Sequence, residues 1–533
     1  MLADAGWSVL VLESQDEPGG AVRSGELTVP GQVCDLFSAF YPLAAASPAL
    51  RGLGLERHGL RWRNAPAVLA HPLPDGRCAV LHRSPEATAR SVDDFAPGDG
   101  AAWLRMYEEW QRVGPHVLAA LFRPVPPVTP TLRLARALGA GGGVRFARRS
   151  LLPVLRLGEE WFRGEGARLL LTGCALHTDL APGEAGSGAY GWLLAMLGQQ
   201  FGFPVPEGGA GRLTDALVAR LRAAGGQLVC GVHVNRILVH EGRVDGVATT
   251  EGETVGVARA VLADVTAPSL YRDLIGRQQL PARLIADLER FQWDRPTLKI
   301  DWALSAPVPW SSAGTREAGT VHLGAGTSAL AGYAAQLAAG AMPRRPYLVM
   351  GQMTTADPTR SPPGTESAWA YTHLPHGTPT SRALARHVER IEDTLERHAP
   401  GFRDLVVARR IAGPEQLEAD DASLVGGATT GGTAALHQQL IFRPTPGLGR
   451  SETVIDGLYL ASSSAHPGGG VHGACGANAA RAALARYRPG GRIYAAGMLG
   501  LTRHLQGDAP GGRPAKGRLR GPTSRQGLRA RPP

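Results

Sequence analysis

Residues 457–487 read GLYLASSSAHPGGGVHGACGANAARAALARY, and this stretch decides the fold. Residues 458–461 are typical of a short apolar strand, and the alanine-rich residues 476–484 favour a helix. Four glycines, at positions 468, 469, 470 and 473, lie between the strand and the helix. Free backbone N–H groups and the helix dipole make such a loop a good phosphate site. A tight structural turn is the alternative interpretation, and so many glycines directly before a helix favour the phosphate site.

The first residues suggest a second half of the same site. Residues 7–13, WSVLVLE, predict a buried strand that ends in Glu13, and Gly19 and Gly20 follow. In a Rossmann unit such an acid hydrogen-bonds the ribose of an adenine dinucleotide. The glycine finger of that unit lies about 20 residues earlier, so counting back from Glu13 runs off the front of the chain. We therefore expect the first strand and its GxGxxG to precede Met1.

Several segments carry a resemblance to a known family. They are residues 9–24, VLVLESQDEPGGAVRS; residues 203–226, FPVPEGGAGRLTDALVARLRAAGG; residues 298–310, LKIDWALSAPVPW; residues 424–432, LVGGATTGG; and the stretch quoted first. The chain resembles the FAD-dependent phytoene desaturase and carotenoid isomerase group within the amine-oxidase-like flavoproteins. Within that group it looks most similar to the subgroup called pyridine nucleotide-disulphide oxidoreductase domain-containing protein 2. The resemblance covers about residues 1–487.

This resemblance implies an α/β (α+β) fold. A Rossmann-like FAD-binding domain, truncated at its first strand, is expected to be interleaved with a substrate domain of mixed sheet plus helices. The FAD-binding domain would comprise residues 1–75, 205–275 and 435–487. The substrate or cap domain would comprise residues 76–204 and 276–434, and residues 488–533 would form a disordered basic tail.

The resemblance also implies a set of cofactor-binding residues. Glu13 would hold the adenosine ribose, and Gly19, Gly20 and Arg23 would lie along the phosphates and the flavin. Val234 would contact the adenine region through its backbone. Asn478 would sit in the helix that follows the glycine loop. The residues expected close to the isoalloxazine are Pro467, Gly468, Gly469, Gly470 and Val471.

No catalytic residue can be assigned from the sequence. His466, inside the last glycine segment, is a candidate for tuning the flavin or for acid–base chemistry, and a structural hydrogen bond is the favoured alternative. His472 has less to support it. Asp301 lies in an alternating strand and could face either way.

The function implied is hydride transfer from a C–H bond of an apolar, polyene- or isoprenoid-like substrate to flavin N5, because the hydride chemistry belongs to the cofactor. Oxygen or a quinone would accept the electrons. A flavin amine oxidase is the second hypothesis, although no aromatic cage for an amine can be recognised from the spacing. The third is a non-catalytic or interaction protein that has lost FAD through N-terminal truncation.

Composition limits the other classes of function. The five cysteines include no CxxC, which argues against a disulfide framework, a zinc site and a dithiol redox centre. No metal site is predicted. Of the net charge of +10, nearly all lies after Tyr487, where the composition predicts a solvated end. The body of the chain has no basic stripe that would indicate nucleic acid.

The expected location is cytoplasmic, since no apolar run is long enough to span a bilayer and no signal peptide is visible. Residues 116–162 are broken by prolines and alternate between apolar and arginine side chains. They could form an amphipathic surface that touches a membrane or an apolar substrate. Short helices packed on a larger domain are the favoured interpretation, and GAGGGV at residues 139–144 is expected to be a loop.

Overall fold

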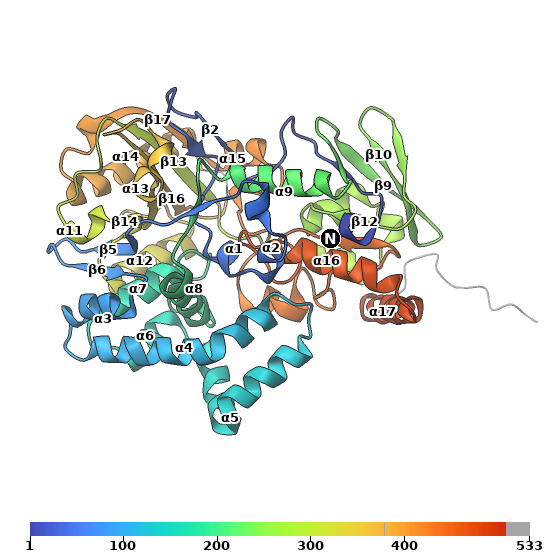
Figure 1. The fold of residues 1–533 in the computed structure, drawn as a ribbon, viewed down its shortest axis with the longest axis horizontal. Helices are drawn as coiled ribbons and strands as arrows, with labels where there is room; N and C mark the ends of the chain where they lie inside the picture. The colour runs from blue at the N-terminus through green and yellow to red at the C-terminus, as the bar shows by residue number, and fades with distance from the viewer. Residues whose placement is uncertain (378, 508–533) are drawn as a thin grey trace, which may run out of the picture.

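The computed structural model describes residues 1–377 and 379–507. Two parts lie side by side along the long axis of the molecule (Figure 1). One part is built on a seven-stranded sheet, and the other on short parallel strand pairs and a three-stranded sheet. The predicted mixed α/β fold is therefore confirmed. Among the described residues, no helix combines the length and the apolar character that crossing a membrane requires.

Two parallel strand pairs lie in the part that the sequence assigned to the cofactor. β1 (Leu10–Leu12) pairs with β8 (Gln227–Val229), and β12 (Val261–Ala263) pairs with β18 (Leu458–Leu460). The helix α9 (Gly211–Ala223) leads into β8, and α16 (Ala474–Arg486) follows β18. The carboxyl ends of these strands therefore carry Glu13 on one pair and the glycine-rich loop on the other.

An antiparallel sheet extends the same part. Its strands are β9 (Val234–His240), β10 (Arg243–Thr249) and β11 (Thr254–Gly256), in the order β11-β10-β9. The turn between β9 and β10 places Glu241 and Gly242 at positive φ, which glycine adopts without strain.

The large sheet has the strand order β17-β13-β16-β15-β14-β5-β6. β13 is buried along its whole length, so both faces of the sheet are covered at this strand. Leu298, Ile300 and Trp302 of β13 pack with Val388 and Ile391 of α14, so the apolar side of this helix covers one face of the sheet. The intervening side chains of β13 point to the opposite face because successive residues of a strand alternate. The bounds are β5 (Ala67–Pro72), β6 (Cys78–Leu81), β13 (Thr297–Leu304), β14 (Ala318–Leu323), β15 (Leu348–Gln352), β16 (Glu366–His373), β17 (Val406–Ala412) and α14 (Ser381–His398).

Six helices, all within residues 85–201, form a layer below this sheet in Figure 1. They pack around buried Trp103, Trp110 and Trp192. Their bounds are α3 (Pro85–Asp93), α4 (Asp99–Leu121), α5 (Val128–Leu151), α6 (Val154–Trp161), α7 (Glu165–Ala175) and α8 (Ser187–Phe201). Residues 139–144 lie inside α5, so the loop predicted there is wrong. A kink at Gly139, with φ of 67°, is what remains of the glycine signal.

The prediction of disorder from residue 488 onward is also wrong at its start. Residues Gly491–Gln506 form α17, which packs on α16. Thr502 and Gln506 are buried, and Gln506 Nε2 donates to the Pro446 carbonyl at 2.5 Å. The averaged composition of the tail hid this helix. Residues 508–533, the remainder of the predicted tail, lie outside the described residues.

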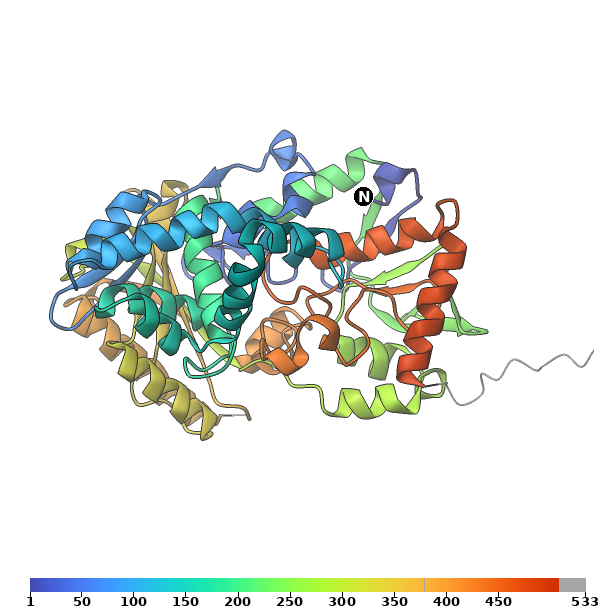
Figure 2. The same ribbon diagram turned by 90° about the horizontal axis from the view of Figure 1, so that it is seen from below.

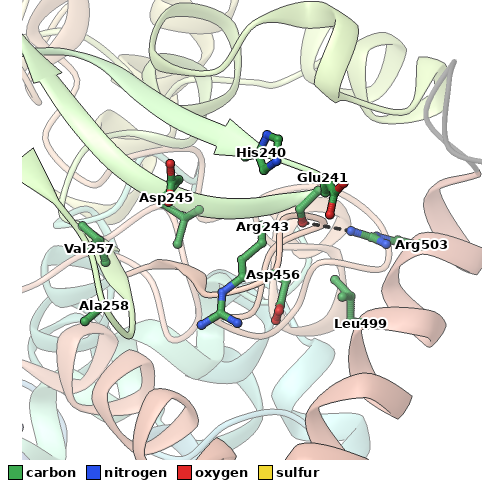
Figure 3. A pocket seen from close by; sticks show the side chains of 11 residues that line it. His240, Glu241, Arg243, Asp245, Val257, Ala258, Asp456, Leu499 and Arg503 are labelled. Atoms are coloured by element: carbon green, nitrogen blue, oxygen red, sulfur yellow. Dashed lines mark hydrogen bonds between the residues drawn. The ribbon is translucent and has the colours of Figure 1, made fainter. Parts of the chain in front are cut away.

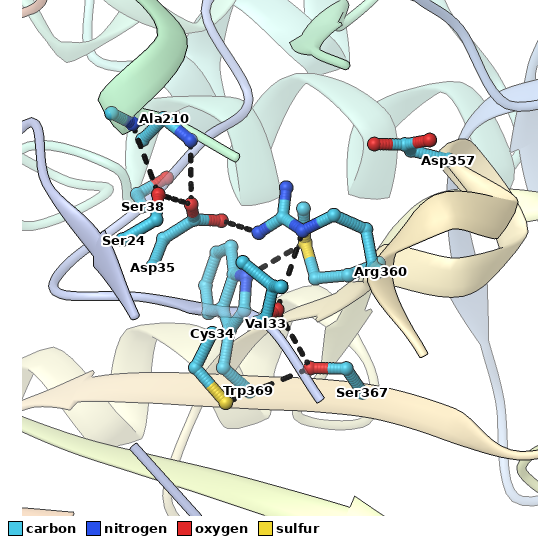
Figure 4. A network of polar contacts seen from close by, with 12 residues as sticks. Ser24, Val33, Cys34, Asp35, Ser38, Ala210, Asp357, Arg360, Ser367 and Trp369 are labelled. Atoms are coloured by element: carbon cyan, nitrogen blue, oxygen red, sulfur yellow. Dashed lines mark hydrogen bonds and ion pairs between the residues drawn. The ribbon is translucent and has the colours of Figure 1, made fainter. Parts of the chain in front are cut away.

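A buried ion-pair network joins the two parts (Figure 4). Asp35, at the end of β3 (Cys34–Asp35), pairs with Arg360, and both side chains are fully buried. Asp35 also accepts hydrogen bonds from Ser24 Oγ and the Ala210 N–H, each at 2.7 Å. Removing one partner of such a pair leaves an uncompensated buried charge, so this contact fixes how the two parts meet.

Asp301, which could have faced either way, points to the face of the sheet that this junction covers. Its Oδ1 pairs with Lys299 Nζ, and Nζ also donates to the Asp35 carbonyl at 3.1 Å. Burial raises the pKa of Asp301, and Lys299 opposes that shift. Asp301 is therefore part of the ion-pair network.

The predicted domain boundaries stay predictions. β5 joins the seven-stranded sheet through β14 and β6, so residues 67–72 lie with the strands assigned to the substrate domain rather than with β1.

Candidate functional site

The first predicted segment lies at the carboxyl end of β1. The Glu13 N–H donates to the Val229 carbonyl, and the Val232 N–H donates to the Glu13 carbonyl, each at 2.9 Å. Glu13 Oε1 accepts the Gln15 N–H at 2.8 Å. Val234 begins β9 two residues after Val232. The structure thus brings Glu13 and the segment that carries Val234 together, although they are far apart in the sequence.

Gly19 and Gly20 form a turn that is closely surrounded. Their φ values are 120° and 53°, which are strained for any residue with a side chain. A Cβ on Gly20 would lie 2.8 Å from Asp421 Oδ2. Arg23 Nε donates to the Gly20 carbonyl at 2.9 Å, and its Nη2 donates to the Asp420 carbonyl. Arg23 therefore ties this turn to the end of α15 (Pro414–Asp420).

The glycine-rich loop of residues 467–471 packs on a second glycine segment. A Cβ on Gly469 would lie 2.4 Å from Thr430 Cβ, and one on Gly468 would lie 3.3 Å from Arg443 Cζ. Ser464 Oγ donates to the Gly431 carbonyl at 2.8 Å. Only glycine permits this approach. The segment GATTGG, which the sequence singled out without a role, is thus the support of the loop.

Two buried charges that the sequence did not indicate hold that support in place. The Asp294 carboxylate accepts the N–H groups of Thr429, Thr430 and Gly432 at 2.6, 3.0 and 3.2 Å. Arg443 is fully buried and donates to the carbonyls of Thr430 and Ser463 at 2.7 and 2.8 Å. Burial raises the pKa of Asp294 and lowers that of Arg443. The sequence gives no hint that Asp294 and Arg443 support this segment, because each is a single charged residue outside any recognisable motif.

His472 has a structural role. Its Nδ1 accepts the Ala474 N–H at 3.0 Å, so Nε2 carries the proton and donates to the Gly468 carbonyl at 3.1 Å. Burial lowers its pKa to about 4, which keeps the ring neutral. His472 therefore closes the loop onto the first turn of α16.

His466 and Asn478 present polar atoms without a protein partner. Burial lowers the pKa of His466 to about 4, and its buried Nε2 has no hydrogen-bond partner within the described residues. Asn478 Oδ1 accepts from Arg481 at 2.9 Å, while its buried Nδ2 has no partner among the same residues. An unsatisfied buried polar group is costly, so both atoms indicate a place for a ligand group.

A carboxylate of β12 connects these segments. Asp264 directly follows the strand. Protein surrounds its carboxylate at a distance, but the side chain is not packed against it and faces open space. Burial, with smaller contributions from Asp421 and Glu13, raises its pKa to about 6. Asp264 therefore lies near Glu13 and Asp421, which brings the carboxyl ends of both parallel strand pairs close to the Gly19–Gly20 turn. Parallel sheets bind ligands at this edge.

An aromatic cluster, here called the aromatic wall, lies beside the predicted cofactor segments. Its Trp369 is buried, whereas Phe37, Phe40 and Tyr371 are half-buried. The Trp369 and Tyr371 rings of β16 stack with centroids 5.9 Å apart and an interplanar angle of 11°. Phe40 lies 6.1 Å from Trp369, and Phe37 lies 5.7 Å from Tyr371. Val22 and Val471, one from each predicted cofactor segment, pack against the cluster that contains Trp369 and Tyr371. The sequence could not bring these rings together, because they come from segments more than three hundred positions apart.

Neutral histidines lie behind Tyr371. His177 Nε2 is 2.8 Å from His322 Nε2, and Tyr371 Oη is 3.5 Å from His177 Nδ1. Burial lowers the pKa of His177 to about 3 and that of His322 well below its usual range. The wall is therefore backed by polar but uncharged groups.

A separate groove lies away from this region, between the β9–β10 turn and α17 (Figure 3). Its volume is about 510 Å³, and its walls include Arg243, Asp245, Asp456 and Arg503. No predicted site residue lines it. It is therefore not part of the candidate cofactor site.

Comparison with known proteins agrees with the geometry. Residues 1–281 match the family described as flavin containing amine oxidoreductase. The chain belongs to this family. The family description names a flavin. A flavin is a class of cofactor that would suit a site where glycine loops and strand ends lie together.

Two curated relatives are also similar to this chain. The protein named pyridine nucleotide-disulfide oxidoreductase domain-containing protein 2 of Rattus norvegicus is 27% identical, over 89% of each chain. A lycopene-forming phytoene desaturase of Pseudescherichia vulneris is 25% identical, over 55% of this chain and 58% of its own. These likenesses confirm the resemblance noted from the sequence.

Solved structures show the same fold. An oxidoreductase from Methanosarcina mazei superposes with a TM-score of 0.57 at 16% identity, over 91% of this chain and 95% of the other. Putrescine oxidase superposes with a TM-score of 0.55 at 15% identity, over 94% and 95%. The architecture is therefore that of the amine-oxidase-like flavoproteins.

Proposed function

We propose that this chain is a FAD-dependent oxidoreductase that desaturates or isomerises an apolar, polyene- or isoprenoid-like substrate. The observation that carries this proposal is the wall of Phe37, Phe40, Trp369 and Tyr371, backed by histidines that burial keeps neutral. An uncharged aromatic wall suits an apolar chain.

FAD fits the residues around the open space. Glu13 would hold the adenosine ribose, with the backbone near Val234 beside the adenine. Gly19, Gly20 and Arg23 would lie along the phosphates and the flavin. The unpartnered Nδ2 of Asn478 is available to a cofactor group at the start of α16. When bound, the flavin would supply the hydride-accepting chemistry.

The residues of the chain have three tasks in this proposal. The aromatic wall binds and orients the substrate and excludes water. Residues 467–471, fixed from behind by Asp294 and Arg443, would form the platform beside the isoalloxazine. His466, neutral and with a free Nε2, would face a bound group as a hydrogen-bonding partner rather than as a charged acid. Oxygen or a quinone would reoxidise the enzyme.

A flavin amine oxidase is the second candidate. The stacked Trp369 and Tyr371 rings favour it, because aromatic faces attract ammonium groups. Lys299 Nζ already lies 6.0 Å from the Trp369 ring centroid. This cation already lies beside the ring and would repel a second one, so we rank the polyene substrate above the amine.

The test has two stages. The purified full chain is first examined for flavin absorbance near about 450 nm, a property of the cofactor itself. Absence of flavin after reconstitution with FAD would favour a non-catalytic or interaction protein. The flavoprotein is then assayed with a panel of polyenes and a panel of amines. Turnover of amines alone would refute the desaturase proposal.

Tyr371→Ala gives a sharper test of the wall. It should weaken polyene binding and raise KM at least tenfold while flavin content is retained. Tyr107→Ala is the matched control, because this half-buried Tyr of α4 packs in the helical layer rather than with the wall, and the change should leave KM unchanged. Equal KM values for both variants would show that the substrate binds elsewhere.

A further inference from the structure

The outward side of α17 is apolar. Ile493 is 81% exposed, and Leu501 and Leu505 are also exposed. A spacing of four residues places positions 493, 497, 501 and 505 along one side of a helix. Neighbouring exposed side chains of this size indicate a surface that something covers.

α17 is fixed in the orientation that exposes them. Arg503 donates from Nε to the Val454 carbonyl and from Nη2 to the Gly242 carbonyl, each at 3.1 Å, and the second bond is drawn in Figure 3. Arg283 Nη1 donates to the Leu505 carbonyl at 2.8 Å. The inner side of the helix is therefore tied to the body of the protein.

The apolar surface continues beyond α17. A Cβ on Gly447 would lie 3.2 Å from Leu505 Cβ, and the Gly447 N–H donates to the Ile441 carbonyl at 3.2 Å. Residues 440–442, Leu-Ile-Phe, are all exposed. Arg450 bridges Tyr494 Oη and the Val125 carbonyl, at 3.1 and 3.0 Å, just before α5 begins. We call the exposed apolar side chains of residues 128–132, 440–442 and 493–505 the apolar belt.

The helices of the apolar belt are cationic. Neither α5 nor α17 contains Asp or Glu. Exposed Arg133, Arg136 and Arg145 lie on α5, and exposed Arg492 lies on α17. The two helices lie along the lower side of the molecule in Figure 1, the side from which Figure 2 is viewed.

The sequence that continues from α17 adds to this charge. After Gly507 its only acid is Asp508. Its cations are Arg513, Lys516, Arg518, Arg520, Arg525, Arg529 and Arg531. The apolar belt thus ends at the point where a polybasic sequence starts.

We propose that the apolar belt docks on an anionic lipid bilayer, with the basic sequence after Gly507 attracted to the headgroups. The binding of a protein surface to a bilayer strengthens with buried apolar area and with the attraction of basic residues to anionic lipids, and the apolar belt and the sequence after it combine the two. A second copy of the chain would bring arginines against arginines. A nucleic acid would leave the exposed Ile and Leu side chains without a role.

Flotation of the full chain with vesicles tests the proposal. Vesicles of phosphatidylcholine containing phosphatidylglycerol should carry the protein, and pure phosphatidylcholine vesicles should carry at least tenfold less. Salt should weaken the binding, because ions screen the headgroup charge. A chain that ends at Gly507 should lose the salt-dependent part of the binding. The affinity should fall by about fivefold for each cation of the removed sequence that reaches the membrane surface.

The double variant Ile493→Asp/Leu501→Asp should lower the remaining binding at least tenfold. Val407→Asp is the matched control, because Val407 is also exposed, at 61%, but lies on β17 in the other part of the molecule. Circular dichroism and the unfolding temperature show whether both variants remain folded. Unchanged binding of the double variant, or equal binding to both kinds of vesicle, would overturn the proposal. So would a change in sedimentation mass without a change in flotation, since the surface would then join copies of the chain.

Discussion

Gly469→Ala tests the packing that supports the proposed cofactor loop. The added Cβ would lie 2.4 Å from Thr430 Cβ and 2.8 Å from Thr430 Cα. Ordinary contacts begin at 3.4 Å, so the two segments must separate by about 1 Å. The Cα is backbone, and a rotation of the Thr430 side chain cannot relieve that contact.

Overpacking of this kind costs about 1–3 kcal/mol. The strain falls on residues 429–432, which Asp294 and Arg443 hold with a set of buried hydrogen bonds. We expect the loop to move rather than its support. Gly469→Ala should therefore lose both stability and most of the bound flavin.

Gly332→Ala is the control, because this glycine lies outside the proposed cofactor segments. No described atom lies within 4 Å of its added Cβ, and Gly332 is in the helix α12 (Thr327–Ala338). Alanine there should leave flavin content unchanged and stabilise the helix by up to about 1 kcal/mol. Thermal unfolding and the ratio of flavin to protein absorbance measure both effects. Equal flavin content in the two variants would refute the argument from close packing.

Three further predictions follow from the buried charges. Burial lowers the pKa of His466 to about 4, so the neutral ring contributes fully to stability above about pH 6.5, and this contribution is lost as the pH falls toward 4. The loss amounts to up to about 3 kcal/mol in the free energy of unfolding. An unfolding temperature that stays constant between these pH values would contradict the prediction. Arg360→Met leaves Asp35 buried without its partner and should cost about 3–5 kcal/mol in chemical denaturation, whereas Arg212→Met at an exposed pair should cost under about 1 kcal/mol; similar losses would show that the junction is not needed. Asp294→Ala should release more flavin than Asp294→Asn, which keeps one acceptor oxygen, and the absorbance of the dialysed proteins would reveal the opposite order.

The sequence predicts those parts of the site that are local in the chain. The order of strand, glycine loop and helix at residues 457–487 depends on neighbouring residues, and the structure has it. The strand before Glu13 is also present, but only as Leu10–Leu12. The burial predicted for residues 7–13 is wrong, because Leu10 and Val11 are exposed. The helix α9 and the strand β8 are local in the same way, because Leu213, Leu217 and Leu221 recur at helical spacing and Gly225 and Gly226 separate the two elements. Patterns that repeat within a dozen residues are readable because they reflect backbone propensity and one buried face.

The supports of the site could not be predicted in this way. Asp294 lies more than a hundred positions from the N–H groups that it accepts, and Trp369 lies more than three hundred positions after Phe40. No periodicity records such contacts. The error at α17 has another cause, because its helix-forming residues were averaged with the Gly- and Pro-rich sequence after it.

The pairing of the short parallel strands has a consequence for how the protein is made. Leu10 pairs with Gln227, and Val261 pairs with Leu458. A ribosome emits the chain from its N-terminus, so β1 must wait for β8, and β12 must wait until almost all of the described chain has emerged. Such distant pairings fold slowly and leave apolar edges open meanwhile. Co-translational assembly should therefore begin in the helical layer of residues 85–201, and the cofactor region should close last.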